Sequence, residues 1–225
     1  MADHAHTETL ALRVQFDTAG QQKDASTLGM WIFLITEVMF FGGMFAAYTV
    51  YRNWYPMVFA VASTSLNAPI GATNTCILLF SSFTMVMAVR AGQLGQQKMI
   101  VIFLILTLLF GFAFLGVKAV EWKEKFEEHH IPGQAAFHLE GLPAAQQGNA
   151  QLFFSLYFAM TGLHALHMVI GAGILMVLIV QARKGRFTAD YYTPVDVAGL
   201  YWHFVDIIWI FLFPLLYLID RHLGK

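Results

Sequence analysis

Five long apolar runs dominate this chain of 225 residues and leave few folds open to it. Each run has at least about the 20 residues that an α-helix needs to cross a bilayer. Their approximate limits are residues 28–51, 69–91, 99–120, 152–180 and 197–219. The runs lack the alternation of apolar and polar residues that membrane barrel strands show. Only 12% of the residues are charged, whereas soluble domains carry about 25%. We therefore predict an all-α integral membrane protein, a bundle of five transmembrane helices.

The polar segments between and before the apolar runs indicate how the chain is divided. Residues 1–27 are polar and lack the basic start and apolar core of a signal peptide. We expect them to form a tail before a single membrane domain at residues 28–225. The connections are short except for a long polar loop at residues 121–151. Because Glu121 and Lys125 have i,i+4 spacing, we expect the third helix to continue into water for a turn or two.

Charge and cysteine content exclude several classes of function. The formal net charge is −1, so nothing in the composition indicates a nucleic-acid partner. The single cysteine, Cys76, lies inside an apolar run. One cysteine can form neither an internal disulfide nor a thiolate metal site within the chain.

Five ionisable residues lie well inside the apolar runs, where a charge is costly: about 2.5–3.5 kcal/mol for an aspartate at mid-helix. They are Glu37, His164, His167, His203 and Asp206. Glu37 and Asp206 are each the tenth residue of runs that point the same way, so both carboxyls should lie about 15 Å from one membrane face. His203 and Asp206 share a helix face, as do His164 and His167. We predict one buried polar cluster from the first, fourth and fifth helices.

Three interpretations of this polar cluster are open. The one we favour is structural, with interhelical hydrogen bonds that hold the bundle together. The second is a site for a lipid head group or an element that conducts protons. The third is a metal or haem site built from histidines. His-x-x-His alone is a weak pattern, and the sequence lacks the His-Glu-x-x-His of zinc proteases.

Small and aromatic residues give further expectations about packing. Small residues let membrane helices approach closely, and the glycine candidates are Gly42, Gly43, Gly171 and Gly173. Aromatic residues near the ends of the runs should anchor the helices at the membrane interface, and they include Trp31, Trp54, Tyr201 and Tyr217.

Four ordered stretches carry a family resemblance. They are TEVMFF at 36–41, LGVKAVEW at 115–122, TGLHALHMVIG at 161–171 and YWHFVDIIW at 201–209. Together they resemble subunit III of the haem–copper oxidases, from about residue 28 to residue 218. The last stretch resembles the signature of the family's last helix. The first resembles the stretch that holds the family's carbodiimide-reactive membrane glutamate, which would place that role on Glu37.

The resemblance implies the fold, location and work of the chain. The fold would be that of the bacterial five-helix subunit III, without the first two helices of seven-helix members. The chain would lie in the bacterial cytoplasmic (inner) membrane, with the N-terminal tail on the cytoplasmic side. It would be a non-catalytic subunit of a proton-pumping cytochrome c oxidase, packed on subunit I and supporting stable oxygen reduction and proton uptake.

The same resemblance implies where the cofactors and partners are. Haem and copper would belong to subunits I and II, and this chain would bind none of them. Phospholipid is the ligand that the resemblance suggests for this chain. The partners would be subunits I and II, membrane lipids and, beyond them, a larger respiratory supercomplex.

Three alternatives to this function stay open. Two lie in the same superfamily: subunit III of a quinol oxidase, and an accessory protein of nitric oxide reductase, for which the loop at 121–151 is longer than expected. The third belongs to another class, a small proton-coupled transporter that uses Glu37 and Asp206 as relay groups. The sequence shows no inverted repeat of the kind that transporters contain.

Overall fold

The computed structural model describes residues 13–128, 130–133 and 137–218. Five helices in this part of the chain are long and apolar enough to cross a membrane, which confirms the predicted all-α, five-helix fold. They are α2 (Ala19–Trp54), α4 (Ala68–Gln93), α5 (Gln97–Glu127), α6 (Gln147–Arg183) and α7 (Thr193–Phe213). The shorter elements are α3 (Pro56–Thr64), the 3-10 turn η1 (Ala144–Gln146) and the π-helical turn η2 (Pro214–Leu218), which continues α7.

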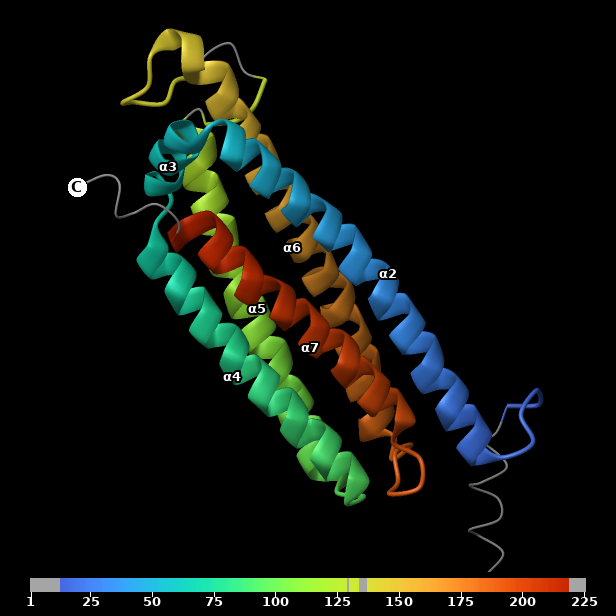
Figure 1. Ribbon diagram of the computed structural model, residues 1–225. Coiled ribbons are helices and arrows are strands. Elements are labelled where there is room, and N and C mark those ends of the chain that lie inside the picture. Colours follow the sequence, from blue (N-terminus) through green and yellow to red (C-terminus); the bar gives the residue numbers. More distant parts are fainter. Residues whose placement is uncertain (1–12, 129, 134–136, 219–225) are drawn as a thin grey trace, which may run out of the picture.

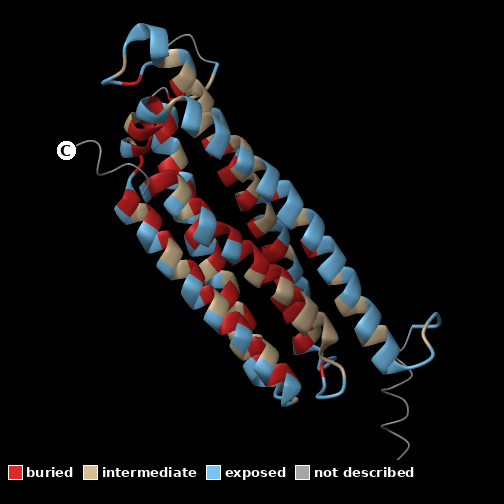
Figure 2. Cartoon of the chain, viewed as in Figure 1, coloured by how far each residue is buried: buried red, intermediate tan, exposed pale blue. Residues whose placement is uncertain are grey.

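The helices form a ring of four with one helix outside it. α4 packs on α5, α5 on α6, α6 on α7, and α7 closes the ring on α4, while α2 lies against α6 and α7 and contacts the short α3 (Figure 1). Burial follows this arrangement, because 56% of the apolar stretch of α7 is buried but only 11% of that of α2. Figure 2 shows the exposed residues along most of α2.

The N-terminal boundary of the first membrane helix differs from the prediction. The expected tail at residues 1–27 is too long, because α2 already begins at Ala19. The Thr18 hydroxyl caps the helix by accepting a hydrogen bond from the backbone N–H of Gln21. Ala, Gln and Lys are good helix formers, so the polar segment extends the membrane helix beyond its apolar part. The rest of the expected tail, residues 1–12, lies outside the described residues.

The connection after α5 is shorter than the loop predicted at residues 121–151. α5 continues to Glu127, as the charge spacing predicted, and α6 already begins at Gln147. The Gln147 side chain fastens the connection by accepting a hydrogen bond from the Leu139 N–H and donating one to the Leu139 carbonyl, both at 2.9 Å. One face of the last turns of α5 is buried in protein and does not face water.

Trp202 shows where small residues bring the helices close together. A Cβ atom added at Gly171 on α6 or at Gly111 on α5 would come within 2.9 Å of the Trp202 ring. The indole of α7 therefore fills a space that these glycines leave free, which confirms the prediction at Gly171. The other predicted positions face open space, with nothing within 4 Å of an added Cβ: Gly42, Gly43 and Gly173.

Candidate functional site

Glu37 and His167 form a polar pair between α2 and α6. Nε2 of His167 lies 3.2 Å from Oε2 of Glu37, and Nδ1 lies 2.8 Å from the Leu163 carbonyl oxygen. A carbonyl can only accept, so Nδ1 must carry a hydrogen. Nε2 then either accepts a proton from the Glu37 carboxyl or donates one to its carboxylate. In either case a single hydrogen bond joins α2 to α6 at this point.

The surroundings of this pair are partly open. The His167 side chain is 12% exposed and that of Glu37 is 19% exposed. The Phe41 ring packs edge-on against the imidazole at 5.3 Å between centroids. Tyr201, expected at the membrane interface, is instead buried and donates a hydrogen bond to the His167 backbone carbonyl at 3.0 Å. Helices α2, α6 and α7 thus meet at one polar position.

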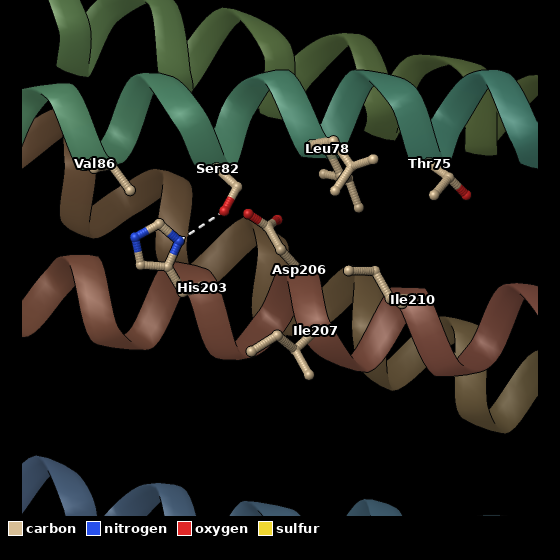
Figure 3. A pocket seen from close by; sticks show the side chains of 9 residues that line it. Thr75, Leu78, Ser82, Val86, His203, Asp206, Ile207 and Ile210 are labelled. Carbon is tan, nitrogen blue, oxygen red and sulfur yellow. Dashed lines mark hydrogen bonds between the residues drawn. The ribbon is translucent and has the colours of Figure 1, made fainter.

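His203 and Asp206 lie elsewhere, between α7 and α4. Nδ1 of His203 is 2.8 Å from the Ser82 hydroxyl (Figure 3). Asp206 is only 3% exposed, and Figure 3 shows its carboxylate beside Ser82. The Ser82 hydroxyl, which also bonds to His203, is a hydrogen-bond partner of the Asp206 carboxyl group. The two residues share a helix face, as their spacing predicted, but that face meets α4.

His164 occupies a third environment, in the interior of the ring. Its imidazole lies between the Phe114 and Trp209 rings, at centroid distances of 5.3 and 5.2 Å. Both ring nitrogens lack a hydrogen-bond partner within the described part of the chain. The prediction of a single cluster is therefore wrong. Bulky Trp202 and Trp209 fill the inner face of α7, which turns His203 and Asp206 outward, away from Glu37.

A fourth polar group, missed in the sequence, lies at the far end of α5. Nζ of Lys118 donates to Oε1 of Glu121 at 3.1 Å, to the Tyr157 hydroxyl at 3.1 Å and to the Tyr217 hydroxyl at 2.6 Å. Both tyrosine hydroxyls also donate to Oε1 of Glu121. Lys118 and Glu121 are 3% and 1% exposed. We call these four residues the α5 network.

The sequence did contain a signal for the α5 network. Lys118 and Glu121 look like the polar end of an apolar run, but they continue a stripe with 3–4-residue spacing. The buried members of that stripe are Leu104, Thr107, Gly111, Phe114, Lys118, Glu121 and Lys125. A stripe that keeps its helical period marks a buried face whatever the residue types. Tyr217, expected as an interface anchor, is also buried here, whereas Trp31 and Trp54 are exposed.

Each of the three histidines inside the membrane helices is in contact with other groups of this chain. Both nitrogens of His167 have partners, one nitrogen of His203 faces Ser82, and His164 is enclosed by aromatic rings. Among the described residues, no three histidine, cysteine or acidic side chains are grouped so that they could hold a metal ion. What the arrangement can do is join helices. Glu37 and His167 link α2 to α6, and Ser82 links α4 to His203 and Asp206 of α7.

Comparison with known proteins gives the family. A family model described as cytochrome c oxidase subunit III matches residues 134–220. Cytochrome c oxidase subunit 3 of Thermostichus vulcanus is 31% identical over 95% of this chain and 97% of its own length. Quinol oxidase subunit 3 of Bacillus subtilis (strain 168) is 32% identical over 85% of each chain. Cytochrome c oxidase subunit 3 of Gallus gallus is 31% identical over 84% of this chain and 67% of its own. The chain therefore belongs to the subunit III family of the haem–copper oxidases.

Proposed function

We propose that this subunit III is a non-catalytic, redox-inactive member of a proton-pumping oxidase in a bacterial cytoplasmic membrane. It packs on subunit I, with subunit II in the same complex, and leaves haem and copper to those partners. The observation that carries the proposal is the dispersal of the intramembrane polar residues. Glu37 with His167, His203 with Asp206, and His164 lie in three different environments. Such a set suits helix packing and proton affinity better than ligation of a redox metal.

The Glu37–His167 pair is the part of the chain that we assign to proton uptake. The support for this assignment is the 3.2 Å hydrogen bond between an imidazole and a carboxyl group, two side chains that can each accept a proton. The exposed apolar face of α2 beside it offers a surface for phospholipid. We place the N-terminus on the cytoplasmic side. A protease site or reporter attached to the N-terminus tests this placement. It should be accessible from the cytoplasmic side only.

Cytochrome c is the electron donor that we propose for the complex. Among the relatives compared above, the one with the fullest mutual coverage is named a cytochrome c oxidase subunit. A quinol donor is the second candidate, because a quinol oxidase subunit is similarly close at 32% identity. Turnover of the purified complex with reduced cytochrome c, compared with turnover with a quinol, separates the two donors.

Purification through a tag on this chain tests the proposal as a whole. In mild detergent, haem absorption bands and two larger oxidase subunits should accompany the chain. After the chain is separated from its partners, the haem bands should stay with the partners. Stoichiometric haem, iron or copper in the separated chain would contradict the redox-inactive role. Absence of haem from every preparation would contradict membership of an assembled oxidase.

Replacement of Glu37 tests the role of the Glu37–His167 pair. Glu37→Ala should leave assembly and haem content unchanged but shorten the time over which the oxidase keeps its activity. Met39→Ala is the matched control, because Met39 lies on the same helix and is exposed. Both variants are followed by oxygen consumption until activity is lost. Failure to insert haem in Glu37→Ala would contradict a supporting role.

A further inference from the structure

A hollow of about 420 Å³ lies between the start of α5 and the end of α6. It is at the end of the bundle where α2 begins (Figure 1). Two exposed cations line it, Lys98 of α5 and Arg183 of α6. The remaining lining residues are Gln97, Val101, Ile102 and Ala182. No acidic side chain is among them, so the hollow carries positive charge over an apolar floor.

The two cations of this hollow are not neutralised within the described part of the chain. The ion pairs found there involve neither Lys98 nor Arg183. Lys23, at the same end of the bundle, instead donates a hydrogen bond to the Tyr192 hydroxyl at 3.2 Å. Unpaired cations on two sides of one hollow attract an anion, because each gains a charge-assisted interaction with it. The hollow is therefore suited to a ligand with negative charge.

The depth of these cations indicates which anion can reach them. Lys98 directly precedes the apolar run that begins at residue 99, and Arg183 lies three residues beyond the run that ends at residue 180. Both therefore lie within about 5 Å of the end of the apolar part of their helix. The head groups of a bilayer occupy a layer about 5–8 Å thick directly outside the hydrocarbon core. The cations are thus at the level of phospholipid phosphates.

Two stripes of exposed apolar residues lead from the cations into the membrane. Their helical spacing places each stripe on the same helix face as its cation. The members are Ile102, Leu106 and Leu109 on α5, and Val180 and Met176 on α6. From Lys98 to Leu109 the α5 stripe is about 16 Å long, which is about half of a hydrocarbon core about 30 Å thick. An acyl chain of one leaflet can therefore lie along the stripe while its phosphate stays between the cations.

We propose that the α5–α6 hollow binds the phosphate of an anionic phospholipid, whose acyl chains lie along the apolar stripes of α5 and α6. Lys98 supplies a point charge, and the Arg183 guanidinium can donate two parallel hydrogen bonds to phosphate oxygens. A zwitterionic lipid fits less well, because the hollow has no carboxylate for its ammonium group. The inference goes beyond the proposed function, which places phospholipid on α2, and it does not depend on the oxidase role.

Photolabelling of the purified complex in nanodiscs tests this site. The probe is phosphatidylglycerol with a photoreactive diazirine in one acyl chain, and phosphatidylcholine with the same acyl chain is the reference. Mass spectrometry locates the labelled peptides. In the parent chain, phosphatidylglycerol should label the peptides of α5 and α6 beside the hollow at least about fivefold more than phosphatidylcholine does, because basic side chains near the membrane surface attract anionic lipid.

Removal of charge at the hollow is compared with removal of the same charge beside it. Lys98→Gln with Arg183→Gln should lower phosphatidylglycerol labelling to the level of the phosphatidylcholine reference. Lys184→Gln with Arg186→Gln is the matched control, because both residues are exposed after the end of α6 and neither lines the hollow. This control should keep the labelling of the parent. Lys98→Arg with Arg183→Lys retains both charges and should also keep most of it.

Three results would overturn the inference. They are equal labelling by the two probes, no labelling of α5 and α6 in the parent, and an equal loss of labelling in the hollow variant and in the matched control. If the double variant at the hollow fails to fold, Lys98→Gln and Arg183→Gln alone decide, and each should lower the labelling by about threefold. Haem that co-purifies with the chain is measured in the same samples. Its absence would contradict the proposed function and leave the lipid site standing.

Discussion

The two faces of α7 differ in how their polar groups are paired. On the inner side, Trp202 and Trp209 are buried, and Tyr217, at the end of the same segment, joins the α5 network. There, one oxygen of Glu121 accepts hydrogen bonds from Lys118 and two tyrosines. On the outer side, Asp206 is equally buried and is bonded to the neutral Ser82 hydroxyl. The difference is that the inner group contains a buried ammonium, whereas the outer group is joined through the Ser82 hydroxyl between His203 and Asp206.

The largest difference in folding free energy is expected between two variants that each remove a carboxylate from one face of α7. In the chain separated from its partners, Glu121→Leu leaves the Lys118 ammonium buried without its counter-charge and should cost about 3–5 kcal/mol of folding free energy. Asp206→Leu removes a hydrogen bond to the neutral Ser82 hydroxyl, so it should cost less, about 0.5–1.5 kcal/mol. Loss of helix content during titration with a denaturing detergent measures both variants.

A double variant provides the control for this contrast. Lys118→Met with Glu121→Leu replaces both charges by apolar groups and should recover most of the loss, because a buried ion pair contributes little beyond a well-packed apolar pair. If Asp206→Leu destabilises the separated chain as much as Glu121→Leu does, the two faces of α7 do not differ in the way described.

Packing should show the next largest effect. A methyl group added in Gly171→Ala would lie 2.9 Å from the Trp202 ring and should cost about 1–3 kcal/mol through overpacking. Gly173→Ala, two residues away on the same helix, meets nothing within 4 Å. It should be neutral or slightly stabilising, because alanine favours helix. Equal thermal midpoints of the two variants in detergent would show that the inner face is less tightly packed than the structure indicates.

The number of helices could be predicted from the sequence, whereas their rotation could not. The length of an apolar run depends on the chain alone, so five runs gave five spans. The spacing of His203 and Asp206 places them on one face of α7. It does not tell which neighbour that face meets, because this depends on how Trp202 fits between Gly111 and Gly171. The prediction of a single cluster was wrong because the sequence did not show which neighbour this face meets.

The α5 network was missed for a different reason. Lys118 and Glu121 were assigned to the polar end of a run by residue type, although their spacing continued the buried stripe of α5. Their partners Tyr157 and Tyr217 come from distant segments, 36 and 96 residues after Glu121. Only the folded chain brings these hydroxyls together. Periodicity could therefore have revealed the buried face but not the groups that complete it.

The smallest effect is expected from His130, which lies outside the membrane helices. It is a change in folding stability with pH. His130 follows α5, stacks on Phe154 at 5.0 Å between ring centroids, and lies near Lys125 and Glu128. Burial, and then the Lys125 charge, lower the pKa of His130 below 6.5 against the opposing effect of Glu128. Below that pH the unfolded chain takes up a proton that the folded chain resists, so the stabilisation present above pH 6.5 is lost as the pH falls.

Thermal unfolding of the separated chain between pH 8 and pH 5 measures this dependence. His130→Phe keeps an aromatic ring against Phe154 and removes the titrating group, so its midpoint should fall less on acidification than that of the parent chain. His138→Phe is the matched control, because His138 is exposed in the same connection, and it should keep the parent's dependence. If acidification instead lowers the midpoint of His130→Phe as much as that of the parent, groups other than His130 cause the pH response.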